Sequence, residues 1–156
     1  RARARIAASN PAKLAAVRRI LAAHPEATAL IIGQYLDQLA GLAEALEAPL
    51  VTGRTDTRSR EAVYAGLGSG AIRRAVLSRV ANQAIDLPAA DLAIEVSGCF
   101  GSRQEEAQRL GRILRPKGGR TAHFYTIVSA GTVEEDYAAR RQRFLLERGY
   151  RFRIDE

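Results

Sequence analysis

Residues 29–53 read ALIIGQYLDQLAGLAEALEAPLVTG, and the spacing of their apolar side chains changes twice. The continuous apolar run at 29–33 is typical of a short buried strand that ends at a glycine. Residues 35–46 predict a helix, because leucine and alanine recur at helical spacing and form one core-facing side: Leu36, Leu39, Leu42, Ala43 and Leu46. A second apolar run at 50–53 predicts another strand. Strand, helix and strand in this order predict two parallel strands joined by a helix.

The same alternation continues along the rest of the chain. Asn10 and Pro11 are typical of a helix start, and that helix is expected to reach about Ala23. The further expected elements are a helix at 57–67, strands at 75–78 and 92–96, a helix from Ser102 to Pro116, a strand at 123–128 and a helix at 132–148. Strands rich in Val, Ile and Leu that alternate with helices predict one α/β domain, with a mostly parallel sheet covered on both faces.

Polar loops follow the predicted strands at their carboxyl ends. They contain residues 33–35, 52–55, 78–82 and 97–102, and several include glycine. In open parallel sheets, ligands bind beside the loops at this edge. The sequence therefore predicts a binding site along one edge of the sheet, with a partly basic rim.

The charge balance favours a polyanionic partner. The chain of 156 residues carries 24 Lys and Arg against 17 Asp and Glu, and only Lys13 and Lys117 are lysines. Arginine suits paired contacts with phosphate. The single cysteine, Cys99, excludes an internal disulfide, and with His24 and His123 it forms no zinc spacing, so both histidines are interpreted as structural and no metal site is expected. No apolar run approaches the roughly 20 residues that cross a bilayer.

Residues 104–116, called the arginine segment below, read QEEAQRLGRILRP and are expected to be helical. At about 100° per residue, Gln104, Gln108, Arg112 and Arg115 fall within roughly an 80° arc. Two guanidinium groups and two amides on one face suit phosphate. A solvated arginine-rich helix face is the alternative.

The sequence lacks several nucleotide-binding motifs. It has no Gly-x-x-x-x-Gly-Lys-[Ser/Thr] phosphate loop, no G-x-G-x-x-G after the first strand, and no acidic cluster at a strand end for magnesium. We therefore expect the arginines to meet a nucleotide bound on another domain, where they would stabilise charge on a transferred phosphoryl group. The chain contains no methionine, even at position 1, so it is expected to be a piece of a longer protein.

These motifs resemble a known family. Residues 108–115, with the pattern QRxGRxxR, resemble the last motif of superfamily-two helicases, and residues 78–88 resemble the motif before it. Residues 31–35 and 52–61 resemble earlier motifs of the second RecA-like domain of these enzymes. Three segments resemble one branch of this superfamily more specifically, the XPB branch of DNA-repair and transcription helicases: residues 101–115, 124–129 and 141–152.

The resemblance runs from about Asn10 to Phe152 and implies a three-layer RecA-like domain. It implies the second motor lobe of an ATP-dependent 3′-to-5′ DNA helicase or translocase. Residues 1–9 would be a linker from an N-terminal helicase lobe, and residues 10–156 the C-terminal RecA-like domain. ATP and Mg²⁺ would be held mainly by the first lobe.

The resemblance also implies roles for individual residues. Arg112 and Arg115 would be arginine fingers that reach the γ-phosphate of ATP between the lobes, and Gln108 would help place the attacking water or the γ-phosphate. Arg109 would serve the interdomain or nucleotide contact, and Asp86 would approach the ribose or couple nucleotide state to DNA. Residues at the strand ends would track a single-stranded DNA backbone: Gln34, Gly53, Arg54, Ser78, Arg79 and Asn82.

The implied partners are single-stranded and forked DNA, the N-terminal RecA-like lobe, and repair nuclease or transcription proteins, with no membrane. The implied location is the nucleoid in a prokaryote and the nucleus in a eukaryote. From the residues alone, two other functions stay open: a non-catalytic basic nucleic-acid-binding module, and a free-standing nucleotide-binding enzyme on a Rossmann-like sheet. Simpler interpretations also stay open for Asp86, as a loop cap, and for Arg54 and Arg79, as solvated arginines.

Overall fold

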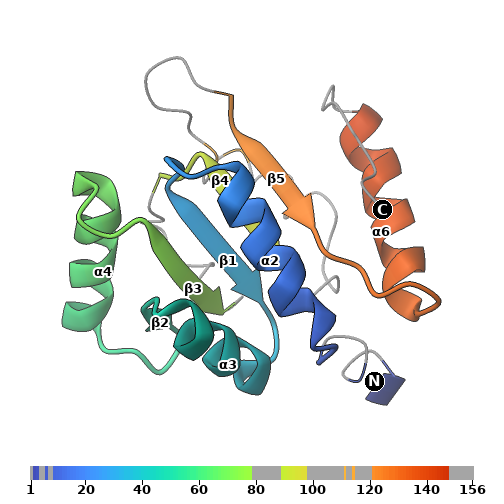
Figure 1. The fold of residues 1–156 in the computed structure, drawn as a ribbon, viewed down its shortest axis with the longest axis horizontal. Helices are drawn as coiled ribbons and strands as arrows, with labels where there is room; N and C mark the ends of the chain where they lie inside the picture. Colours follow the sequence, from blue (N-terminus) through green and yellow to red (C-terminus); the bar gives the residue numbers. More distant parts are fainter. Residues whose placement is uncertain are drawn as a thin grey trace.

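The computed structural model describes residues 2, 3, 6, 9–78, 89–97, 111, 114 and 121–147. Within these residues a parallel sheet lies among four helices (Figure 1). The strands are β1 (Ala29–Gly33), β2 (Leu50–Val51), β3 (Arg74–Ser78), β4 (Leu92–Glu95) and β5 (His123–Thr126). The helices are α2 (Ala12–Ala23), α3 (Leu36–Leu46), α4 (Thr57–Ser69) and α6 (Val133–Glu147). The predicted α/β class is confirmed.

The described strands lie in the order β2-β3-β1-β4-β5, and every neighbouring pair is parallel. Ile31 at the centre of β1 is paired with Val76 of β3 on one side and with Ile94 of β4 on the other. Because all these strands run the same way, their carboxyl ends lie along one edge. The carboxyl ends of β2, β3, β1 and β4 therefore follow one another along that edge.

Alternate residues of β1 face the two layers of helices, as the period of a strand requires. Ile31 belongs to the core cluster that contains Val17 of α2 and Leu39 of α3. Leu30 belongs to the cluster that contains Leu67 of α4. Ile31, Leu30 and their strand neighbours are fully buried, so α2 and α3 cover one face and α4 covers the other. Each such side chain contributes about 1.5–3 kcal/mol through burial.

Short polar residues begin two of the helices. The Asn10 side chain accepts a hydrogen bond from the Ala12 N–H at 3.0 Å, and Pro11 already has helical angles of φ −59° and ψ −26°. This confirms the predicted start of α2. At α4, the Asp56 carboxylate accepts a hydrogen bond from the Ser59 N–H at 2.8 Å, an N-cap typical of aspartate.

Two predictions about apolar residues are wrong. Leu36, expected in the core, is 46% exposed, because it lies in the first turn of α3, beyond the sheet. Leu114, expected in a helix that runs to Pro116, instead forms a parallel bridge with Ala90. Its side chain packs against the α4-side core cluster. The rest of that expected helix, apart from Gly111, lies outside the described residues.

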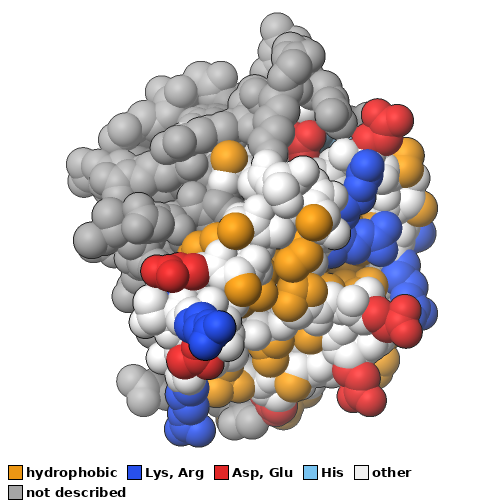
Figure 2. Space-filling model, turned by 90° about the vertical axis from the view of Figure 1, so that its left-hand side faces the viewer, with side chains coloured by type: hydrophobic (Ala, Val, Ile, Leu, Met, Phe, Trp, Pro, Cys, Tyr) orange, Lys and Arg blue, Asp and Glu red, His pale blue; other side chains and the backbone are white. Residues whose placement is uncertain are grey.

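The described surface mixes apolar and charged side chains. On the face drawn in Figure 2, apolar side chains occupy much of the centre, while acidic and basic side chains lie mostly toward its margins. None of the helices among the described residues is both long and apolar enough to cross a membrane.

Candidate functional site at the carboxyl edge of the sheet

The structure brings four of the predicted DNA-contacting residues to the carboxyl edge. Gln34 directly follows β1, and Ser78, the last residue of β3, is paired with Gly33. Gly53 and Arg54 follow β2, the neighbour of β3. The predicted clustering at one edge of the sheet is therefore confirmed for these residues, although their contact with DNA stays a prediction.

The other predicted site residues lie outside the described residues. They include the proposed arginine fingers, the residues beside them and the loop after β3: Gln108, Arg109, Arg112, Arg115, Asp86, Arg79 and Asn82. Their roles stay predictions. The helical arc expected for Arg112 and Arg115 also lies outside the described residues and stays a prediction.

The loops after β1 and β4 are joined by a close contact. The Gln34 N–H donates a hydrogen bond to Ser97 Oγ at 2.9 Å. A Cβ atom at Gly33 would lie 2.8 Å from Ser97 Oγ, 2.8 Å from Leu39 Cδ2 and 3.0 Å from Val96 Cγ2. Glycine at this position allows the two loops to approach each other. The Gln34 side chain remains exposed at the edge.

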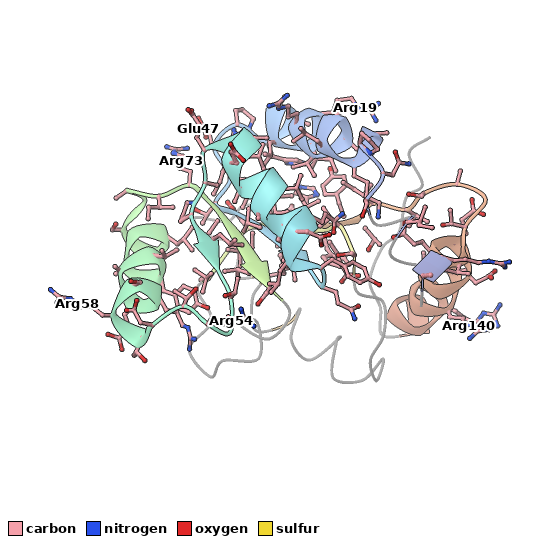
Figure 3. All side chains as sticks on the ribbon, turned by 90° about the horizontal axis from the view of Figure 1, so that it is seen from below. Arg19, Glu47, Arg54, Arg58, Arg73 and Arg140 are labelled. Carbon is pink, nitrogen blue, oxygen red and sulfur yellow. The ribbon has the colours of Figure 1, made fainter. Side chains whose placement is uncertain are left out.

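The loop after β2 is held by its own threonines. The Thr52 N–H donates to Thr55 Oγ1 at 2.9 Å, and the Arg54 N–H donates to Thr52 Oγ1 at 3.1 Å. Arg60 of α4 donates through Nη2 to the Thr55 carbonyl at 3.2 Å, which ties the loop to the helix. The Arg54 guanidinium is exposed on this fixed backbone (Figure 3), where it can meet an anion.

Two titratable groups of α4 and its cap have shifted pKa values. Hydrogen bonds from the Ser59 N–H and Ser59 hydroxyl lower the pKa of Asp56, so its carboxylate stays charged at the helix start. Burial raises the pKa of Tyr64, and the positive charge of Arg60 partly opposes that effect. Tyr64 of α4 is therefore neutral, and Asp56 supplies a fixed negative charge at the start of the same helix.

A buried ion pair lies behind the edge and was missed by sequence reasoning. The side chain of Lys13 is 3% exposed, and its Nζ lies 2.7 Å from Glu134 Oε1. The same Nζ donates to the Val96 carbonyl at 2.7 Å. Glu134 Oε2 accepts a hydrogen bond from the Ser129 N–H at 2.8 Å. The sequence carries one weak signal for this pair, since Lys13 is one of two lysines among 24 basic residues.

The two histidines meet at the opposite edge of the sheet. The ring centroids of His24 and His123 are 4.5 Å apart, and His24 Nε2 lies 2.7 Å from the Tyr125 hydroxyl. Burial and the neighbouring His123 lower the pKa of His24, while Asp91 opposes the shift. The sequence separates these histidines by 99 residues, so only the fold reveals that they form a pair. Among the residues that the structure covers, no three His, Cys, Asp or Glu side chains are grouped to hold a metal ion.

Known proteins match both the sequence and the fold. A relative from Mycobacterium tuberculosis named "DNA 3'-5' helicase XPB" is 52% identical over 153 residues, which cover 97% of this chain and 28% of that protein. A relative of the same name from Kineococcus radiotolerans is 51% identical over 151 residues, which cover 96% of this chain and 27% of that protein. This chain therefore spans about a quarter of the length of these relatives.

A solved structure shares the fold. The E. coli DEAD-box protein SrmB, crystallised with regulator of ribonuclease activity A, superposes with a TM-score of 0.70 at 20% identity, over 85% of this chain and 78% of that chain. This likeness confirms the predicted RecA-like fold. A family model described as "ERCC3/RAD25/XPB C-terminal helicase" matches residues 1–155. With a parallel sheet, polar loops at its carboxyl edge and a match over nearly its whole length, the chain belongs to the ERCC3/RAD25/XPB C-terminal helicase family.

Proposed function

We propose that this chain is the second motor lobe of an ATP-dependent 3′-to-5′ DNA helicase or translocase. Residues 1–9 would join it to a first RecA-like lobe, and residues 10–156 would form the second lobe. The observation that carries the proposal is the family match over residues 1–155. The carboxyl edge supports it, because ligands of open parallel sheets bind there and the strand-end residues Gln34, Gly53, Arg54 and Ser78 lie there.

In this proposal the arginine segment faces ATP bound by the first lobe. Bound ATP supplies the phosphoryl group, whose oxygens carry spread negative charge in the transition state. The guanidinium groups of Arg112 and Arg115 stabilise that charge, and Gln108 orients the attacking water or the γ-phosphate. Arg109 contacts the nucleotide or the first lobe, and Asp86 contacts the ribose or links nucleotide state to DNA.

Two of the described acids near this edge do not suit Mg²⁺, which needs free carboxylate or carbonyl oxygens. Both carboxylate oxygens of Glu134 already accept hydrogen bonds, from Lys13 Nζ and the Ser129 N–H. The Asp56 carboxylate is bonded to Ser59 as a helix cap. We therefore propose that ATP and Mg²⁺ are held mainly by the first lobe, with this lobe contributing the arginines.

The strand-end loops form part of the single-stranded DNA track. Arg54 supplies an exposed positive charge, and the Gly53 backbone and Gln34 side chain lie at the same edge. Ser78, Arg79 and Asn82 complete the proposed set. The partners would be single-stranded and forked DNA, the first lobe, and repair nuclease or transcription proteins. The protein would accordingly act at the nucleoid of a prokaryote or in the nucleus of a eukaryote.

The catalytic part is tested in the two-lobe protein. Arg112→Ala or Arg115→Ala should reduce DNA-stimulated ATP turnover by about 10³-fold, because one charge-stabilising group is lost in the transition state. ATP binding should fall far less. Arg140→Ala is the matched control, since Arg140 is an exposed arginine of α6 (Figure 3). A change confined to KM would count against the finger roles.

A non-catalytic nucleic-acid-binding module is the second candidate, and it is favoured by the net charge of +7. Measuring ATP turnover of the unmodified two-lobe protein with and without single-stranded DNA distinguishes the two candidate functions. If the chain is a motor lobe, ATP turnover should rise when single-stranded DNA is added. Binding of DNA without any ATP turnover would favour the binding module.

A further inference from the structure

We propose that Lys13 and Glu134 are positioning residues that couple the DNA-facing loop after β1 to the end of β4, at Val96 and Ser97, which precedes the arginine segment in the sequence. The inference rests on the proposed function and adds two residues that this function does not otherwise use. Both are buried, and they come from the first turns of α2 and α6. Their ion pair joins the first turn of α2 to the first turn of α6, behind the proposed DNA-contacting edge.

On one side, the ion pair holds the end of β4. Lys13 Nζ donates to the Val96 carbonyl at 2.7 Å. The next residue, Ser97, accepts a hydrogen bond from the Gln34 N–H at 2.9 Å. Gln38 of α3 donates more weakly to the same Val96 carbonyl, at 3.4 Å. Two hydrogen bonds, joined by the covalent link between Val96 and Ser97, therefore connect Lys13 to the loop after β1.

On the other side, the ion pair holds the loop after β5. Glu134 Oε2 accepts from the Ser129 N–H at 2.8 Å, while Glu134 Oε1 binds Lys13. The Asn10 side chain donates to Ser129 Oγ at 3.4 Å. The start of α2 is thus bonded both to the end of β4 and, through Glu134, to the turn before α6.

The chemistry of the pair suggests a geometric role. A buried ion pair often contributes no more net stability than apolar residues of similar volume, but its hydrogen bonds are directional. Here they give the Val96 carbonyl, next to the Ser97–Gln34 contact, a charged donor of fixed direction, in addition to the hydrogen bond of the Val96 N–H with the Ile32 carbonyl. A shift of the end of β4 is therefore transmitted to the loop after β1 through the hydrogen bond between the Gln34 N–H and Ser97 Oγ. In the proposed motor, this path links the nucleotide side of the lobe to the DNA side.

The test uses the double variant Lys13→Met/Glu134→Gln in the two-lobe protein. The double variant leaves no lone buried charge, and the amide oxygen of the introduced glutamine keeps an acceptor for the Ser129 N–H. We expect the thermal midpoint to stay close to that of the unmodified protein. The ratio of DNA-stimulated to basal ATP turnover should fall roughly tenfold, the size typical of coupling between two sites. The KM for ATP should change little.

The matched control is Arg19→Met, which removes a positive charge from an exposed position of the same helix and should keep the normal ratio (Figure 3). Ser97→Ala removes the acceptor of the Gln34 N–H and should also lower the ratio of DNA-stimulated to basal turnover. This smaller change serves as the test if the double variant folds poorly. An unchanged ratio in both variants, or equal losses of basal and stimulated turnover, overturns the inference. An unmodified protein without DNA-stimulated turnover would instead overturn the proposed function.

Discussion

Replacing Gly33 with alanine tests the closest contact at the edge of the sheet. The added Cβ would lie 2.8 Å from both Ser97 Oγ and Leu39 Cδ2, and 3.0 Å from Val96 Cγ2. All three neighbours are buried, so none can move into solvent to relieve the clash. The substitution therefore forces either the start of α3 or the end of β4 to shift.

Two effects set the size of the destabilisation. Overpacking a buried site costs about 1–3 kcal/mol. A shift of Ser97 also weakens its hydrogen bond with the Gln34 N–H, which contributes about 0.5–1.5 kcal/mol. Together they predict a loss of about 2–4 kcal/mol in the free energy of unfolding. For a chain of this size that lowers the thermal midpoint by about 5–15 °C.

The assay is thermal and urea unfolding of this chain, followed by circular dichroism. Gly41→Ala is the matched control, because Gly41 lies within α3 and no atom is within 4 Å of the added Cβ. In a helix interior, alanine is more stable than glycine by about 0.5–1 kcal/mol. The two substitutions should therefore shift the midpoint in opposite directions. A Gly33→Ala midpoint equal to or above that of the unmodified chain would refute the packing argument.

Two further predictions concern the opposite edges of the sheet. Burial and His123 lower the pKa of His24 below 6.5, and Asp91 opposes that shift. The folded chain therefore favours neutral His24, so the free energy of unfolding should hold its full value above about pH 6.5 and decline as the pH falls below it. His24→Gln should flatten that decline in urea unfolding between about pH 7 and 5, and an unchanged slope would contradict it. Arg54→Ala in the two-lobe protein should weaken the salt dependence of single-stranded DNA binding, measured by fluorescence anisotropy. The slope of log binding constant against log salt concentration should become about 0.7 less steep, because one phosphate contact is lost. Arg73→Ala, at the amino edge, should leave that slope unchanged, and equal slopes for both variants would remove Arg54 from the track (Figure 3).

The sequence alone was sufficient for the elements whose signals are local. Residues 29–33 are a continuous apolar run and form β1, while the repeat at 35–46 forms α3. Polar residues after the strands predicted the edge at which Gln34 and Arg54 lie, because parallel strands place their carboxyl ends together. The motif order in the sequence likewise indicated the helicase family, which the family match confirms.

Only the tertiary structure decided which distant residues meet. Lys13 and Glu134 lie 121 residues apart in the sequence, and no periodic pattern links them. The same holds for His24 with Tyr125, for the bridge that takes Leu114 out of the expected helix, and for the strand order β2-β3-β1-β4-β5. Local propensity acts over a few neighbouring residues, whereas these contacts depend on how whole strands and helices pack.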